Sequence, residues 1–510
     1  MAVKRYYAKI DNTITNAFEE NLTTRGTGSN MGASDILEVF SIFAQANSSS
    51  AEEARALIKF NATASTDSIT ADRTAGVIPA SGSVSFYLRM FNAKHGQTLP
   101  KNFTMDVSAI SGSWEEGTGL DMEAYKDKDE SNWINRVASS SAGTHAWATQ
   151  GGDYYTDTSS SFSASFDSGV EDLEVDITTL VEQWVSSSAN SKTATDMGSK
   201  NDEGVGVFLS SAYSGASRSY YTKKFFARGT EFFFKKPCIE ARWDSATKDD
   251  RGTFFYSSSL ATAAENLNTL YLYNYFRGQL RNIPSIGTGN IYLSIYSGSV
   301  NDTEPFGSRI DLVPDGTHVR SALKTVVTGA YVSTGIYSAS FAATGTLTTL
   351  YDVWHDGDTV EFQTGTIKPE ILYASTTAPD TTFASNITNL KSVYRGDETA
   401  RFRVYTRQKG WSPTIYTKAS AQAEVNIVES GSYEIYRVVD DLKVIPYGTG
   451  STLHTQMSFD ADGSYFDLDM EMLEKGYMYG IKLAFYNNSV GSWVEQPETF
   501  KFRVESRQSK

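Results

Sequence analysis

The chain has 510 residues, of which 40% are hydrophobic and 21% are charged. This is the composition of a folded globular protein, and the length suits roughly three to four domains. The formal net charge is −15 at pH 7. It argues against nucleic acid and anionic membranes as main partners, because an acidic surface is repelled by both. No apolar run approaches the ~18 residues that a membrane-spanning helix needs.

Cysteine usage and the N-terminus bear on the cellular compartment. The single cysteine, Cys238, cannot form an internal disulfide bond. The first ten residues are followed directly by polar residues and contain no apolar segment of the kind that directs secretion. Together these features predict a protein that folds in a reducing cytoplasm.

Alternating apolar and polar residues predict β-strands along most of the chain, because successive side chains of a strand point to opposite faces. The clearest strands, in chain order, are Val84–Phe91, Ile291–Tyr296, Tyr479–Tyr486 and Phe500–Val504. Turn signals lie between strands, among them Ser297-Gly298-Ser299 and Asp462-Gly463. Strands with one apolar face are typical of antiparallel sheets packed as sandwiches, so we expect an all-β protein of tandem β-sandwich domains.

One segment departs from the β pattern. Asp176 or Thr178 can cap a helix whose next turns place Leu180, Val181 and Trp184 on one apolar face. We therefore expect a short helix that packs across the edge of a sheet through Trp184.

Two stretches with few apolar residues predict domain boundaries. The first is the charged stretch Asp244–Gly252, and the second, Ala374–Thr382, resembles a short, stiffened linker. They divide the chain into residues 1–245, 246–375 and 376–510. The two smaller pieces have the size of immunoglobulin-like sandwiches.

A series of short motifs in residues 1–245 resembles the DNRLRE domain family in its order and spacing. The motifs are Asp11–Ile14, Ile36–Val39, Arg55–Asn61, Val84–Phe91, Ser113–Gly119, the helix around Trp184, Gly204–Leu209 and Lys236–Ala241. The resemblance implies a jelly-roll-like β-sandwich of a kind found on surface and extracellular proteins and in some virion proteins. Beyond Asp244 the sequence resembles the tandem Ig-like modules of large structural proteins from marine tailed bacteriophages.

The sequence predicts no catalytic, cofactor-binding or metal-binding residues. Glu115 and Glu116 are adjacent, so on a strand they point to opposite faces and cannot flank one glycosidic bond; a turn beside a buried Trp114 explains them better. Asp460–Gly463 lacks the spacing of an EF-hand loop and reads as a hairpin turn. Cys238, next to a proline on a strand, is expected to be buried. The five histidines are scattered, so neither zinc nor a serine nucleophile has sequence support. A structural calcium ion in the first domain remains open.

The densest aromatic stretch is the candidate for a subunit contact. Its interface candidates are Phe225, Phe226, Phe232, Phe233 and Phe234, flanked by Lys223, Lys224, Lys235 and Lys236. Five aromatics so close together are hard to bury from both faces of one sheet, and the lysines could orient an acidic neighbour. The alternative is a pair of core strands whose lysines face water.

These features predict a non-enzymatic structural component of a tailed-phage virion, assembled in the host cytoplasm and located at the neck, the tail or the outer surface. Its expected partners are other virion structural proteins and copies of itself. The alternative is a carbohydrate-binding or adhesion protein that recognises surface glycans, since exposed aromatic residues can stack on sugars.

Overall fold

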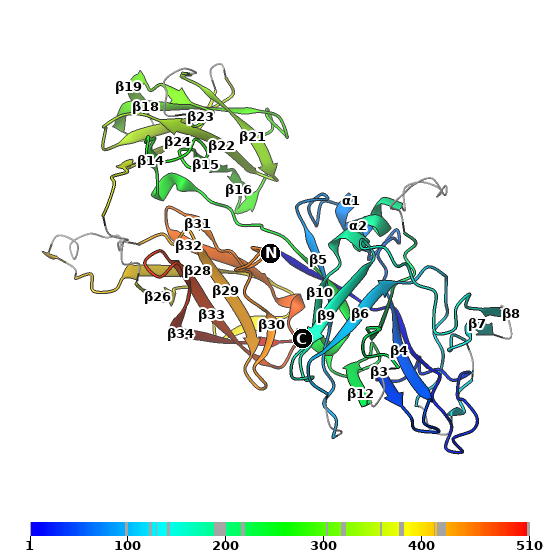
Figure 1. The fold of residues 1–510 in the computed structure, drawn as a ribbon. Helices are drawn as coiled ribbons and strands as arrows, with labels where there is room; N and C mark the ends of the chain where they lie inside the picture. Colours follow the sequence, from blue (N-terminus) through cyan, green and yellow to red (C-terminus); the bar gives the residue numbers. More distant parts are fainter. Residues whose placement is uncertain are drawn as a thin grey trace. The chain divides into compact units, whose positions relative to one another are not determined.

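The computed structural model describes residues 2–96, 100–121, 125–128, 130–139, 143–187, 200–215, 220–301, 304–317, 323–357, 360–376, 382–412, 414–415 and 425–506. β-Strands dominate this part of the chain, which confirms the all-β class (Figure 1). The chain divides into two compact units. One is Ala2–Asp244 with Thr452–His454, and the other is Ser245–Ser451 with Thr455–Lys510.

The first unit is a β-sandwich of two antiparallel sheets. One sheet has the order β1 (Val3–Tyr7), β13 (Cys238–Arg242), β5 (Ser85–Met90), β10 (Leu173–Asp176). The other has the order β12 (Tyr220–Phe226), β3 (Ile36–Phe43), β4 (Ala51–Lys59), β11 (Val205–Leu209), β6 (Phe103–Ala109), β9 (Ser161–Phe166), and β2 (Ile10–Thr15) also pairs with β4. Outside the two sheets are the hairpin β7 (Asn135–Ser139) and β8 (Gly143–Ala146), the helix α1 (Ile69–Thr74) and the 3₁₀ turn η2 (Phe233–Lys235).

The predicted helix is confirmed as α2 (Thr178–Ser187). Asp176 Oδ1 accepts the backbone N–H of Thr178 at 2.9 Å, and Thr178 Oγ1 accepts the N–H of Phe86 at 2.8 Å, which ties the start of the helix to β5. Leu180, Val181 and Trp184 are fully buried in the core. The apolar face predicted from the sequence therefore packs into the sandwich.

The strands of residues 255–371 fold around a separate core. Their main sheet has the order β15 (Asn268–Tyr273), β22 (Ile336–Ala343), β21 (Val327–Ser333), β18 (Ile291–Asn301), β23 (Leu350–His355), β24 (Glu361–Ile367), with β19 (Glu304–Arg309) on β18 and β20 (Leu312–Val313) on β22. Two short pairs complete it: β14 (Phe255–Tyr256) with β25 (Glu370–Ile371), which run parallel, and β16 (Tyr275–Phe276) with β17 (Gln279–Leu280).

The turn predicted at Ser297–Ser299 is wrong, because β18 continues through these residues to Asn301. The pairing of β18 with β19 is irregular between Tyr296 and Gly298. Glycine and serine therefore mark a β-bulge here rather than the end of the strand, which is a common role of glycine inside a strand.

Residues 383–505 form a sandwich of two sheets. One has the order β26 (Phe383–Ile387), β28 (Thr399–Gln408), β32 (Gly463–Asp469), β31 (Ser458–Asp460), and the other β27 (Val393–Arg395), β34 (Ser492–Glu505), β33 (Met478–Asn487), β29 (Gly431–Arg437), β30 (Leu442–Ile445). The 3₁₀ turn η4 (Met470–Met472) follows β32. With β26, β28, β32 and β31 as strands A, B, E and D, and with β29, β33 and β34 as strands C, F and G, the two sheets match those of the immunoglobulin fold. The strands β27 and β30 are additions at the two edges of the second sheet. The hairpin turn at Asp460–Gly463 is confirmed.

Only the first of the two predicted domain boundaries coincides with a division between compact units. The compact units divide between Asp244 and Ser245, at the start of the first predicted boundary. The strands on either side of Ala374–Thr382 belong to different sheets but to the same compact unit, and residues 377–381 of that stretch lie outside the described residues.

Candidate interaction surfaces

The five predicted interface aromatics do not form one exposed face. Phe225 is fully buried in the core of the first unit, and Phe234 is 3% exposed. Phe226 and Phe233 are partly buried, and only Phe232 is exposed, at 43%. The alternation along β12 explains the difference between Phe225 and Phe226, because neighbouring side chains point to opposite faces. Phe225 and Phe234 are thus unavailable to a neighbouring subunit.

The lysines that flank this stretch also differ from one another. Lys223 is buried, which contradicts the expectation that it faces an outside partner. Lys224 forms an ion pair with Glu38 on β3. The ammonium of Lys235 lies 5.0 Å from the ring centroids of both Phe226 and Phe232. What remains at the surface is a small cluster of Phe226, Phe232 and Lys235.

Glu115 and Glu116 lie outside the strands, beside Trp114, whose side chain is 4% exposed. Glu116 accepts two hydrogen bonds from the guanidinium of Arg228, at 2.6 and 2.5 Å. Burial raises the pKa of the neighbouring Asp11 to about 7, and its Oδ2 accepts the backbone N–H of Arg228 at 2.6 Å. This contact joins loops from distant parts of the sequence, so local spacing did not reveal it. Both oxygens of Glu116 are engaged by the arginine, an arrangement suited to holding loops together.

A buried serine–histidine pair also escaped the sequence prediction. Ser294 Oγ lies 2.9 Å from Nε2 of His355, while Nδ1 of His355 accepts the backbone N–H of Gly357 at 3.1 Å. Because Nδ1 is the acceptor, the proton of the neutral imidazole is on Nε2, which donates to the serine. Burial lowers the pKa of His355, which favours this neutral form. The histidine therefore cannot take the proton of Ser294 as a general base.

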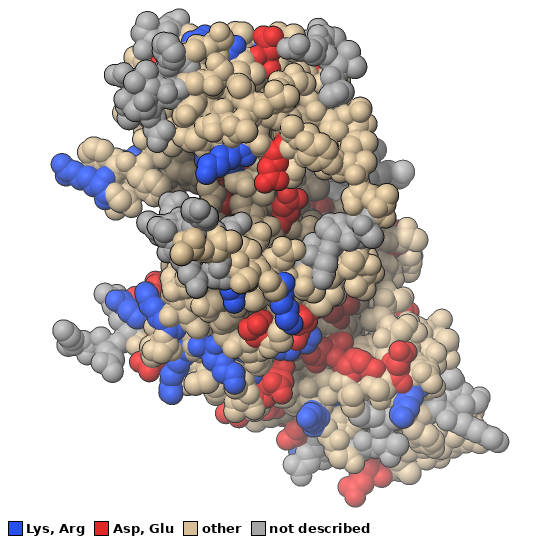
Figure 2. Space-filling model, turned by 90° about the vertical axis from the view of Figure 1, so that its left-hand side faces the viewer, with Lys and Arg blue, Asp and Glu red and all other residues tan. Residues whose placement is uncertain are grey.

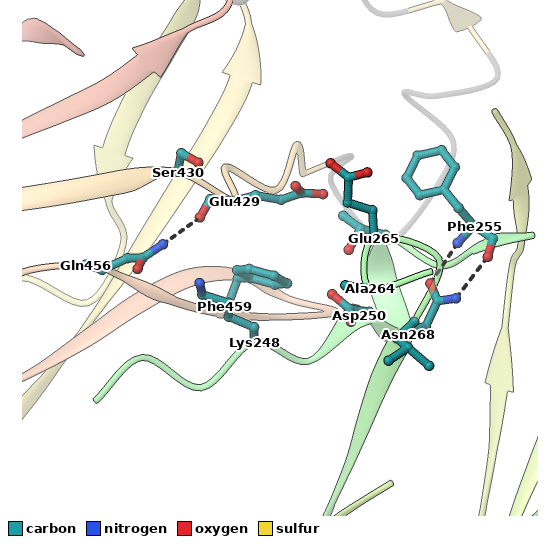
Figure 3. A pocket seen from close by; sticks show the side chains of 12 residues that line it. Lys248, Asp250, Phe255, Ala264, Glu265, Asn268, Glu429, Ser430, Gln456 and Phe459 are labelled. Carbon is teal, nitrogen blue, oxygen red and sulfur yellow. Dashed lines mark hydrogen bonds between the residues drawn. The ribbon is translucent and has the colours of Figure 1, made fainter. Parts of the chain in front are cut away.

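A polar cavity of about 350 Å³ is lined by residues from two segments, 248–268 and 429–459. Figure 3 shows Asp250, Glu265 and Glu429 contributing carboxylates from separate segments, with Lys248 nearby. Burial raises the pKa of Asp250 to about 6, and its Oδ2 accepts the backbone N–H of Thr269 at 2.6 Å. In the part of the chain that the structure describes, no group of three or more His, Cys, Asp or Glu residues is placed to hold a metal ion.

A second hollow, of about 280 Å³, lies next to the first and is lined mainly by apolar residues, including Phe255, Leu260 and Leu372. Three of its lining side chains are exposed, Phe255 at 36%, Leu260 at 58% and Leu372 at 40%, and so are the two chain neighbours of Leu372, Ile371 at 41% and Tyr373 at 76%. We call these five residues the 255–373 surface. The parallel pairing of β14 with β25 brings its two ends together, because Phe255 pairs with Glu370 and Tyr256 with Ile371.

On the face drawn in Figure 2, basic and acidic side chains are interspersed and separated by broad areas without charge. Two further exposed aromatics, Tyr275 at 57% and Phe276 at 53%, lie on β16.

Cys238 is buried as expected, and burial raises the pKa of its thiol to about 11. None of the described helices is long and apolar enough to cross a membrane.

No family model matches the chain, and no curated protein matches it. Among solved structures, a marsupial T cell receptor has a TM-score of 0.16 at 8% identity and covers 51% of this chain and 72% of its own. Titin domains Z1Z2 in complex with telethonin have a TM-score of 0.14 at 14% identity, over 48% of this chain and 89% of theirs. Trypsin-activated α2-macroglobulin from Escherichia coli has a TM-score of 0.15 at 8% identity, over 89% and 24%. Scores this low carry no argument about function.

Proposed function

We propose that this protein is a non-enzymatic structural component of a tailed-phage virion, associated with the neck, the tail or the outer surface, and that it acts through subunit interfaces. Tandem β-sandwiches, an acidic composition and the resemblance of the sequence to virion modules support this role. The observation that carries the proposal is the 255–373 surface. Five large apolar side chains are each at least 36% exposed, and three of them, Phe255, Leu260 and Leu372, line one hollow.

Contiguous exposed apolar side chains are unusual on a monomer and mark places where another protein binds. The 255–373 surface combines aromatic and aliphatic groups, which are enriched at the desolvated centres of interfaces. Its partner is another virion structural protein that presents a complementary apolar centre. An obligate contact of this kind buries more than about 2,000 Å² in total, so polar residues around the hollow belong to its rim.

The test is complementation of a phage that lacks this gene, with a mass-spectrometric inventory of the purified particles. Wild-type chain should appear in a fixed copy number per particle. Replacing Leu372 and Tyr373 together by Asp should give a folded protein that no longer joins particles. Tyr220→Asp, at a residue 65% exposed in the first unit, is the matched control and should be incorporated. Normal incorporation of the double variant would refute the surface, and absence of wild-type chain from particles would refute the role.

Exposed aromatics on β16 favour a second candidate function, the binding of surface glycans. Tyr275 and Phe276 are more than half exposed, and the guanidinium groups of Arg277 and Arg281 lie 5.3 and 5.7 Å from the ring of Phe276. An exposed ring can stack on the apolar face of a sugar while nearby arginines donate to hydroxyl groups. A glycan array probed with wild-type protein and with Tyr275→Ala/Phe276→Ala tests this. Binding that the double substitution leaves unchanged would exclude these two residues.

A further inference from the structure

The buried lysine of β12 contacts an asparagine side chain. Nζ of Lys223 donates to Oδ1 of Asn92 at 2.7 Å, to the carbonyl oxygen of Gly169 at 2.9 Å and to that of Glu171 at 2.6 Å. The Lys223 side chain is 0% exposed. Asn92 is partly buried, so a buried amine is held against the side-chain amide of a neighbouring strand end, an arrangement in which the two groups can react.

Backbone pairing fixes this contact. Beyond the end of β5, Asn92 bridges Phe225 of β12, supported by hydrogen bonds from Ala93 N to Lys224 O at 2.9 Å and from Phe226 N to Phe91 O at 3.0 Å. Lys223 lies two residues from Phe225 and so shares its face, which makes it the diagonal neighbour of Asn92. The register therefore holds the two side chains together.

The surroundings of the amine are apolar on one side and acidic on the other. Nζ lies 4.9 Å from the ring centroid of Phe166 and 5.2 Å from that of Phe225, and both rings are buried. Burial lowers the pKa of Lys223 to about 8, against the opposing charges of Asp172 and Glu171, so a fraction of the amine is neutral near neutral pH. Asp172 also contacts the backbone of Asn92, since its Oδ1 accepts the backbone N–H of Asn92 at 2.7 Å.

We propose that Lys223 and Asn92 form an intramolecular isopeptide bond. The neutral Nζ attacks Cγ of Asn92. Nζ is already hydrogen-bonded to Oδ1, the oxygen that is bonded to Cγ, so the amine lies close to the carbon that it attacks. Effective reaction needs the two atoms about 3–3.5 Å apart. The new bond is Nζ–Cγ and the broken bond is Cγ–Nδ2. One proton of Nζ is transferred to Nδ2, which leaves as ammonia, and no oxidant or cofactor takes part.

The product ties the two sheets of the first unit together. Asn92 follows β5 of the four-stranded sheet, and Lys223 is on β12 at the edge of the opposite sheet. The two residues are 131 positions apart in the chain, so the bond closes a long loop and restricts the unfolded state, as a disulfide of that span does.

Intact-mass measurement of the denatured full-length protein tests the proposal. We expect wild-type protein to weigh about 17 Da less than its sequence, the mass of one ammonia. Trypsin should release Met90–Lys94 joined to Ser219–Lys224, because cleavage after a modified Lys223 is blocked. Lys223→Arg and Asn92→Ala should restore the full mass, while Lys224→Arg, at the adjacent ion-paired lysine, should keep the deficit.

The key measurement does not depend on the folding of any variant, because it is made on wild-type protein. A wild-type mass equal to that of the sequence, together with free Met90–Lys94 peptide, would overturn the proposal. It would identify Lys223 as a buried ammonium held by its three acceptors. A mass deficit that persists in Lys223→Arg would also overturn it, because the lost ammonia would then come from another site.

Discussion

The ion pair between Arg251 and Asp352 gives the sharpest stability prediction. Asp352 lies on β23 with its side chain 0% exposed, and Arg251 belongs to the 3₁₀ turn η3 (Asp250–Gly252). Two bonds join them, from Nη1 to Oδ1 at 2.5 Å and from Nη2 to Oδ2 at 2.8 Å. Nε1 of Trp354 donates to the same carboxylate at 3.0 Å. Gly365 leaves space for the pair, since a Cβ there would lie 2.4 Å from Arg251 Nη1.

Removing only the arginine leaves a buried negative charge. In Arg251→Met the carboxylate of Asp352 keeps the bond from Trp354 and loses both bonds from the guanidinium. Breaking one side of a buried ion pair in this way costs about 3–5 kcal/mol. In Arg251→Met/Asp352→Asn the charge is gone and the asparagine oxygen still accepts from Trp354, so we expect most of that loss to be recovered.

Calorimetric unfolding of the full chain measures these losses, and hydrogen exchange of the β23 and β24 amides assigns them to the main sheet of residues 255–371. Arg401→Met is the matched control, because Arg401 makes a similar two-bond contact with Asp467, at 2.8 and 2.9 Å, on an exposed surface. Exposed pairs contribute little. If Arg251→Met were no more destabilising than Arg401→Met, or if the double variant were no better than the single one, the reasoning from burial would be refuted.

Three further predictions follow from burial. Trp184→Ala should lower the free energy of unfolding by about 3–5 kcal/mol. A melting temperature within about two degrees of wild type would correspond to a loss of only roughly 0.5–1 kcal/mol and would contradict the buried position. Burial raises the pKa of Asp249 to about 7 from 3.8, so between about pH 4 and pH 7 the native state binds a proton that the unfolded state has lost, and the stability falls as the pH rises. Asp249→Asn should remove that fall and be more stable than wild type at pH 8 by up to about 4 kcal/mol. A stability that depends on pH in the same way in both proteins would count against this reasoning. Phe225→Ser should unfold the first unit whereas Phe232→Ser should not, as circular dichroism can check.

The sequence predicted the strands well where one face is buried and the other is wet. In β33, Tyr479, Ile481, Leu483 and Phe485 are all buried, as their alternation indicates. In β34, Phe502 and Val504 are buried while Phe500 is only partly so. The six-residue helix α1 was missed, although Ser68 caps it by accepting the N–H of Ala71, because so short a helix has too few turns to show an apolar stripe.

Side chains held by distant partners were the part that the sequence could not predict. Lysine next to phenylalanine reads as a solvated charge, yet the acceptors that bury Lys223 lie 131, 54 and 52 positions away along the chain. The same holds for the 255–373 surface, whose halves meet only because β14 and β25 pair in parallel. The aromatic density around Phe225 is visible in the sequence, whereas the buried and exposed members are separated by the side-chain alternation of β12 and by the turn η2 that follows it.

The buried ion pairs around Glu240 in the first unit lie within one sheet, whereas the proposed cross-link joins two sheets. The carboxylate of Glu240, which is 0% exposed, is contacted by Arg5 at 2.7 Å, Arg89 at 3.1 Å and Arg242 at 2.7 Å, and their charges hold its pKa well below the usual range despite its burial. These contacts join β1, β5 and β13 within one sheet and do nothing to hold that sheet against the other. With one cysteine, the chain has no internal disulfide for that purpose. The proposed bond from Asn92 to Lys223 would join the two sheets directly and so resist their separation.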